Sequence, residues 1–123
     1  RDIKSYMGPV LRIDEHSFIL LWAISYGSFE ACPSFSGILI IGSLVYNNEL
    51  KNSVLLAESS GGGDPPVWGD VEVFSTLTKK EIISNKTERV CDGDEDENGN
   101  EIVNTTKSKV RLRMGPTGFV VEK

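Results

Sequence analysis

Oxygen-bearing side chains recur at every second position in one acidic stretch of this chain. Residues 92–101 (DGDEDENGNE) contain six acids and no base. Calcium-binding loops wrap the chain around the ion with oxygen donors at alternating positions, and a glycine permits the sharp turn. Gly99 supplies that glycine here. The candidate calcium ligands are Asp92, Asp94, Asp96 and Asn98.

The match to an EF-hand is incomplete. If Asp94 is taken as the first position, Glu101 stands at the eighth position and Thr105 at the twelfth, where a bidentate glutamate belongs. The flanking segments also have the pattern of strands rather than helices. Two interpretations remain open: a looser calcium site, or a solvated loop closed by a tight turn at Asn98-Gly99.

A run of alternating bases follows the acidic stretch. Side chains alternate between the faces of a strand, so these bases share one face and form a candidate binding surface. Its members are Lys107, Lys109, Arg111 and Arg113. The surface either pairs with strand acids such as Asp70 and Glu72 or binds a polyanion. The net charge of −5 argues against nucleic acid as the partner.

The acidity of the chain is concentrated in this one loop. The whole chain has 18 acids and 13 bases, so removing the six acids of residues 92–101 leaves 12 acids and 13 bases. The remainder is therefore nearly neutral. Neighbouring patches of opposite sign can dock on copies of the same molecule, which predicts another protein or a second copy as partner.

Other residues that could bind or catalyse are few. Trp68 follows a glycine- and proline-rich stretch, where it either stacks on a ligand or anchors its own loop. His16 is the only histidine, and Gly61–Gly63 lacks the Lys-Ser/Thr of a phosphate-binding loop. We therefore expect a protein that is not an enzyme and that needs no cofactor, calcium apart.

Cysteines and glycosylation sequons favour an extracellular or extracytoplasmic location. Cys32 and Cys91 are far apart in sequence, which fits one disulfide and excludes a CxxC motif. Asn85-Lys-Thr and Asn104-Thr-Thr are acceptor sequons for N-glycosylation. The chain begins at Arg1 without an initiator methionine, which also fits processing.

The periodicity of the chain predicts strands. Short apolar or alternating segments separated by Gly, Pro and Asn favour a single all-β domain over residues 1–123, an antiparallel sandwich or barrel. The apolar blocks are too short to cross a membrane as helices. The expected strands are 9–13, 18–26, 37–46, 53–57, 67–77, 87–91, 103–114 and 119–121.

Two segments are expected to be something other than strand. Residues 59–66 are rich in Gly and Pro and predict a loop, while residues 78–84 allow a short helix, which would make the domain a small α+β fold. The charges cluster in the second half, so the first half is expected to supply most of the core.

These observations together predict a binding or self-assembly domain, such as a secreted or surface subunit of a filament, shell or coat. The alternative is a carbohydrate- or ligand-recognition module, with or without calcium.

Overall fold

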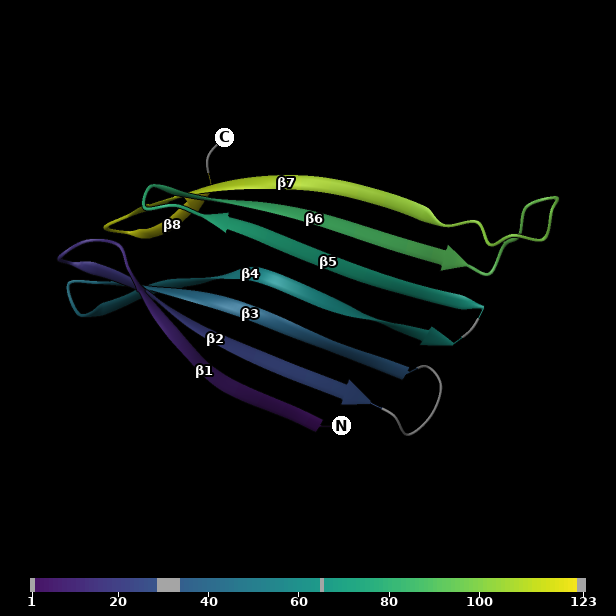
Figure 1. The fold of residues 1–123 in the computed structure, drawn as a ribbon, viewed down its shortest axis with the longest axis horizontal. Coiled ribbons are helices and arrows are strands. Elements are labelled where there is room, and N and C mark those ends of the chain that lie inside the picture. The colour runs from purple at the N-terminus through teal and green to yellow at the C-terminus, as the bar shows by residue number, and fades with distance from the viewer. Residues whose placement is uncertain (1, 29–33, 65, 122–123) are drawn as a thin grey trace.

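Eight antiparallel strands form one open sheet in the computed structural model of the chain (Figure 1). The structure describes residues 2–28, 34–64 and 66–121. Each strand pairs with the strands next to it in sequence, in the order β1 to β8. The strands are β1 (Asp2–Arg12), β2 (Ser17–Ser28), β3 (Ser34–Tyr46), β4 (Glu49–Asp64), β5 (Val67–Leu77), β6 (Glu81–Asp92), β7 (Asn104–Gly115) and β8 (Gly118–Val121). The all-β prediction is therefore confirmed.

Tight turns set the hairpins. Asn47 and Asn48 join β3 to β4 with φ angles of 49° and 65°, which matches the left-handed backbone of a two-residue hairpin loop. In the β1–β2 turn, one carboxylate oxygen of Asp14 accepts hydrogen bonds from the backbone N–H groups of His16 and Ser17, both 2.8 Å long. Polar side chains thus satisfy the backbone where strand pairing stops.

The alternative with a helix at residues 78–84 is wrong. Thr78 closes a turn instead: its hydroxyl oxygen lies 3.1 Å from the amide nitrogen of Glu81, and its own N–H donates to the Glu81 carbonyl at 2.9 Å. From Glu81 the chain continues as β6, and the Ile82 side chain enters the core. Burial of Ile82 overrides a weak local preference for helix.

The loop expected at residues 59–66 is strand as far as Asp64. Here β4 pairs with β3 on one side and with β5 on the other. Backbone hydrogen bonds need no side chains, so a paired glycine run remains extended in spite of its low strand propensity.

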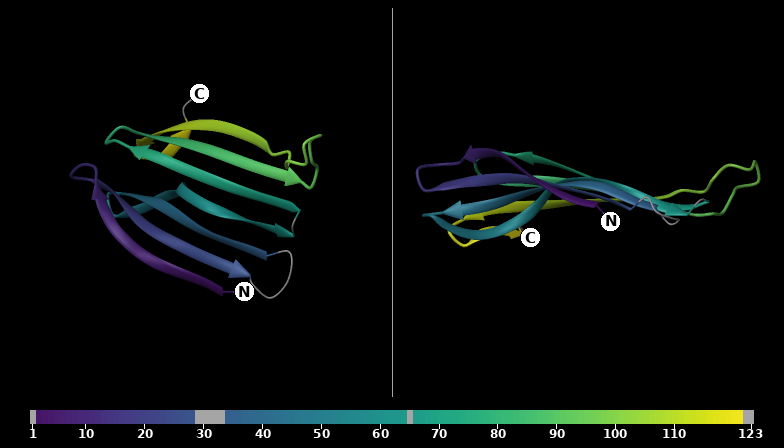
Figure 2. Two further views of the ribbon diagram at one scale, coloured as in Figure 1. Left: turned by 45° about the vertical axis from the view of Figure 1, so that its right-hand side comes forward. Right: turned by 90° about the horizontal axis from the view of Figure 1, so that it is seen from below.

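The sheet divides into two halves at one end. The pairing of β4 with β5 is confined to residues 58–64 and 67–73. Beyond it, β8 lies against β4, where the side-chain amide of Asn52 donates to the Phe119 carbonyl at 3.0 Å and accepts from the Phe119 N–H at 2.7 Å. Figure 2 shows the strands at two levels at this end and in a thin layer at the other.

The core fills the space between these halves. Its buried cluster consists of Ile19, Leu44, Leu56, Ile82, Leu112 and Phe119. The two halves of the sequence contribute equally, so the prediction that the first half supplies most of the core is wrong. Many of the first half's apolar side chains remain exposed because the sheet is open. In the described part of the chain, no helix is long and apolar enough to cross a membrane.

Candidate functional site

The predicted basic face of β7 is present. Residues directly opposite each other in antiparallel strands point to the same side of the sheet. The cross-strand pairs are Lys107 with Thr87, Lys109 with Asn85, Arg111 with Ile83, and Arg113 with Glu81. All four cations are exposed, and we call them the basic stripe.

Acids of the same chain neutralise only part of the basic stripe. Arg111 Nε lies 3.6 Å from an oxygen of Glu81. Asp70, an expected partner, pairs instead with Arg89 on the intervening strand β6. Among the residues that the structure describes, no ion pair forms at Lys107 or Lys109.

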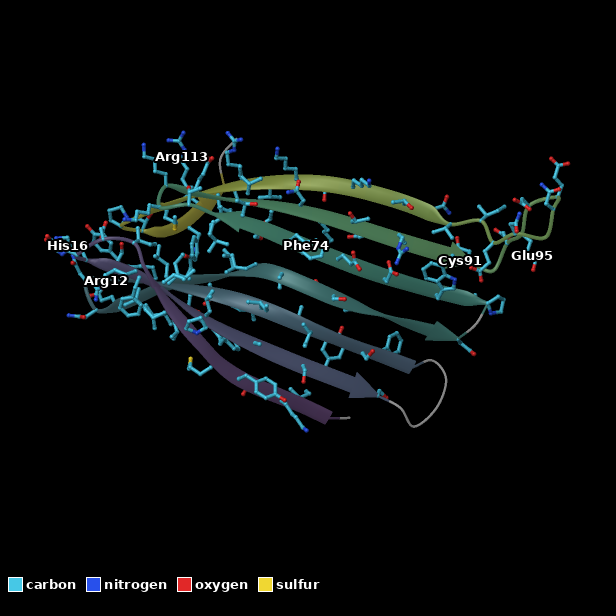
Figure 3. The ribbon with its side chains drawn as sticks, in the orientation of Figure 1. Arg12, His16, Phe74, Cys91, Glu95 and Arg113 are labelled. Carbon is cyan, nitrogen blue, oxygen red and sulfur yellow. The ribbon has the colours of Figure 1, made fainter. Side chains whose placement is uncertain are left out.

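The acidic loop (residues 92–101) projects past the end of the sheet, away from the basic stripe (Figures 2 and 3). Glu95 and Arg113 lie at opposite ends of the β6–β7 hairpin in Figure 3. The backbone N–H of Ile102 donates to the Asp94 carbonyl at 3.0 Å, so the loop's two arms are joined. The hairpin thus carries the acidic loop at one end and the basic stripe along β7, from Lys107 near the loop to Arg113 at the far end.

Asp96 organises the tip of the loop. Its carboxylate accepts hydrogen bonds from the backbone N–H groups of Asn98 and Asn100, both 2.9 Å long. Gly99, with φ of 80°, donates its N–H to the Asp96 carbonyl at 3.0 Å. Asp96 therefore closes a turn at the tip, where the sequence predicts one at Asn98-Gly99.

The four candidate calcium ligands do not form a cluster. No group of three or more His, Cys, Asp or Glu side chains in the described ranges is placed to hold a metal ion. Asp96 directs an oxygen at backbone N–H groups rather than toward Asp92 or Asp94.

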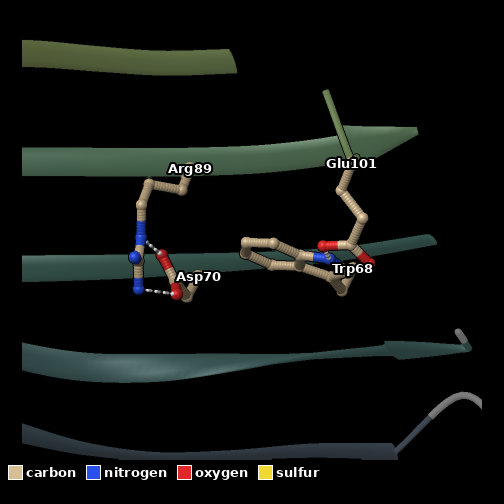
Figure 4. Close-up of polar contacts among 4 residues, drawn as sticks. All are labelled: Trp68, Asp70, Arg89 and Glu101. Carbon is tan, nitrogen blue, oxygen red and sulfur yellow. Dashed lines mark hydrogen bonds and ion pairs between the residues drawn. The ribbon is translucent and has the colours of Figure 1, made fainter. Parts of the chain in front are cut away.

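Trp68 joins the acidic loop to the sheet. Its indole Nε1–H donates to the Glu101 carboxylate at 3.3 Å (Figure 4). The Arg89 guanidinium lies 5.9 Å from the centre of the indole ring, within cation–π range. Arg89 also forms two hydrogen bonds with Asp70, one of them 2.9 Å long, and these hydrogen bonds raise the pKa of the guanidinium. The contact made by Trp68 is therefore with the acidic loop and not with the Gly- and Pro-rich stretch that precedes it in sequence.

Cys91 lies directly opposite Trp68 on the same face and is 0% exposed. Its thiol is free. Cys32 lies outside the described residues. Free cysteine is among the most frequently buried residue types, so this environment is ordinary for it.

The remaining candidate residues are dispersed. His16 occupies the β1–β2 turn, with its ring centre 6.4 Å from that of Tyr46. The sequon residues Asn85 and Asn104 are both exposed, on opposite faces of the sheet.

Sequence reasoning missed a groove on the face opposite the basic stripe. It has a volume of about 330 Å³, with Tyr26 and Phe35 on one side and Glu88 and Val90 on the other. Its floor includes Gly62 and Gly69, which are paired with each other across β4 and β5. The glycines and the aromatic residues Tyr26 and Phe35 were the available signal, but which of them come together depends on the register.

Comparisons with known proteins give no match: no protein-family model, no curated protein and no solved structure is similar to this chain.

Proposed function

We propose that this chain is a non-enzymatic self-assembly domain, a subunit of a filament, shell or coat. In this proposal the acidic loop of one copy docks on the basic stripe of the next. The observation that carries it is that the loop's acids project beyond the end of the hairpin, while Lys107 and Lys109 on β7 form no ion pair among the residues that the structure describes. Opposite patches on one rigid body favour contact between bodies.

The direction of the loop supports contact between copies. The loop continues outward from β6 and β7, so it would have to reverse completely to reach its own basic stripe. A second copy placed end to end needs no such rearrangement. The contact joins two different surfaces, so it is heterologous and builds rings or open chains.

The strength of such a contact depends on salt. Exposed ion pairs contribute up to about 1 kcal/mol each, so several must act together. Screening shortens their range from about 10 Å at 0.1 M salt to about 3 Å at 1 M. Assembly by this contact therefore belongs to low ionic strength.

Sedimentation velocity at graded sodium chloride tests the proposal. We expect species larger than a dimer at low salt, and their loss at 1 M. The variant Asp94→Asn/Glu95→Gln/Glu97→Gln removes three loop charges while it keeps the Asp96 turn, and it should abolish the large species. The control Glu15→Gln/Asp64→Asn/Glu72→Gln removes three exposed charges elsewhere and should retain them. Equal loss in both variants contradicts docking by the loop.

We also propose an extracellular or extracytoplasmic location. Exposure of Asn85 and Asn104 supports it, because an oligosaccharide needs an accessible acceptor. Expression through a eukaryotic secretory pathway, followed by glycosidase treatment, should produce a mass shift that the double variant Asn85→Gln/Asn104→Gln lacks. An unshifted secreted chain counts against this location.

Recognition of a neutral carbohydrate is the second candidate function, and the groove between the Tyr26/Phe35 side and the Glu88/Val90 side favours it. Binding sites for small ligands are concave and largely apolar, with few polar groups. The exposed ring of Phe35 and the carboxylate of Glu88 provide both kinds of surface.

Saturation-transfer NMR with maltotriose and cellotriose tests this second function. We expect transfer from the protein that Phe35→Ala abolishes and that Val110→Ala, on an exposed residue outside the groove lining, retains. Absence of transfer to both sugars removes it.

A further inference from the structure

The chain exposes more solvent-accessible surface than a compact monomeric protein of the same mass. Its accessible surface is 8345 Å² at 13.5 kDa. A compact monomer of that mass exposes about 6,500 Å², so the excess is about 1,800 Å². A specific interface requires only about 800 Å² from each partner. The fold therefore has ample surface for a contact with another chain.

The two outer edges of the sheet differ in their protection. Strand β8 pairs only with residues 112–115 of β7, and the remaining edge carries Lys107, Lys109 and Arg111. Lysines on an edge strand hinder strand addition, and a second β7 would bring like charges together. The charges on β7 therefore disfavour the addition of another strand at this edge.

At the β1 edge, only half of the strand has features that prevent the addition of another strand. The pairing of β1 with β2 shifts between Met7 and Val10, and Pro9 in that bulge has no N–H to donate. Bulges and prolines prevent edge pairing locally. Residues 3–7 remain as a regular segment that, within the part of the chain that the structure describes, has a paired strand on one side only, β2.

Apolar side chains project from both faces of this segment. Ile3 is 65% exposed and Met7 is 72% exposed on one face, while Tyr6 is 54% exposed on the other. An exposed, apolar, unpaired edge is the kind of strand that another strand extends.

We propose that β1 is a dimerisation edge, at which residues 3–7 of two copies pair antiparallel to make one continuous sheet. The occupant is a second copy of this chain. This contact is isologous and apolar, and it uses the edge opposite the basic stripe. It is therefore a second interface beyond the charged contact proposed above.

Symmetry and charge select the register. A two-fold axis normal to the sheet keeps each face on its own side, so only residues that share a face become opposite each other. A register centred on Lys4 would set that ammonium against its own copy. A register centred on Tyr6 would carry the pairing into the bulge.

The register centred on Ser5 avoids both the opposition of two Lys4 side chains and pairing through the bulge. It places Ile3 opposite Met7 of the second copy, an apolar pair. Lys4 lies opposite Tyr6 of the second copy, where the ammonium approaches the ring. Ser5 meets Ser5 of the second copy on the axis. Every pairing in this register is neutral or attractive.

Disulfide trapping tests the register. Opposed residues have Cα atoms about 4.5–5.5 Å apart, within the range that a disulfide spans. In a Cys32→Ser background, Ser5→Cys should form a covalent dimer on mild oxidation. The control Lys4→Cys, one residue away, should crosslink at least about tenfold more slowly. Equal rates for the two variants overturn the register.

Sedimentation at 1 M sodium chloride tests the edge itself, because the charged contact is then screened. We expect a dimer at about 100 μM, with Met7→Lys monomeric and Thr106→Lys still dimeric, and circular dichroism confirming the fold of both. A monomeric wild type at 1 M salt overturns this inference and leaves the charged contact standing. A dimer at 1 M salt that forms no larger species at low salt supports the β1 interface and contradicts the charged contact.

Discussion

Trp68 Nε1 donates a 3.3 Å hydrogen bond to the carboxylate of Glu101, which joins the start of β5 to the returning arm of the acidic loop. The two residues are 33 positions apart in sequence. The same indole neighbours Arg89 and lies opposite the buried Cys91. One side chain thus contacts the acidic loop and lies beside both a guanidinium and a buried thiol.

Removal of the indole should expose Cys91. We expect Trp68→Ala to raise the rate of Cys91 alkylation by at least about tenfold, because a buried thiol reacts only when its cover opens. Trp68→Phe keeps a ring without the hydrogen bond and should remain close to wild type. Peptide mass spectrometry separates modification of Cys91 from that of Cys32. An unchanged rate in Trp68→Ala shows that other groups bury the thiol.

Asn52, which is half-buried between β4 and β8, should contribute substantially to stability. It makes two hydrogen bonds to the Phe119 backbone, so Asn52→Ala leaves a donor and an acceptor without partners. We expect a loss of about 1–3 kcal/mol in the free energy of unfolding, measured with urea. The exposed Thr117→Ala is the control and should change little.

The two neighbouring isoleucines of β6 should differ sharply. Ile82 is fully buried in the core, whereas Ile83 points to the opposite face beside Arg111. Ile82→Ala should cost about 2–5 kcal/mol of unfolding free energy, with a clearly smaller loss for Ile83→Ala. Urea denaturation of both variants gives the comparison. Similar losses contradict the assignment of the core face.

Asp14 should make stability depend on pH in the acid range. A hydrogen bond from the His16 backbone, together with one from the Ser17 hydroxyl, lowers the pKa of Asp14 below its ordinary 3.8. A carboxyl whose pKa is lower when folded stabilises the protein above the unfolded value, and this contribution is lost as the pH falls through the folded value.

The variant Asp14→Ala should therefore unfold at lower urea than wild type at pH 6. The difference should shrink once the pH falls below 3.8. Glu15→Gln, one residue away, should show little pH-dependent difference. A gap that stays constant from pH 6 to pH 2.5 contradicts the role of the Asp14 carboxylate.

The sequence predicts where the strands lie more accurately than it predicts how long they are or which strands pair with each other. Alternation identified the face that Lys107 and Lys109 share, because the period of a strand is a local property. The extension of β4 through Gly61–Gly63 was missed, because pairing on both sides of a strand is not local. Residues 78–84 suggest a short helix because the hydroxyl contacts that Thr78 makes in a turn are also those of a helix N-terminus.

The candidate site divides in the same way. The loop and the stripe were identified from charge alone, and the turn at Asn98-Gly99 followed from residue type. The pairing of Arg89 with Asp70 and the contact of Trp68 with Glu101 depend on register, which one residue of slippage would change.

The order of the strands has a consequence for how the chain folds. Because every strand pairs with its sequence neighbours, each hairpin closes a short loop and can form as soon as its residues are available. The hydrogen bonds between Asn52 and Phe119 are different, since they join residues that are 67 positions apart in sequence. We expect the local hairpins to form quickly. Docking of β8 against β4 should come last, as the slow step that completes burial of the core.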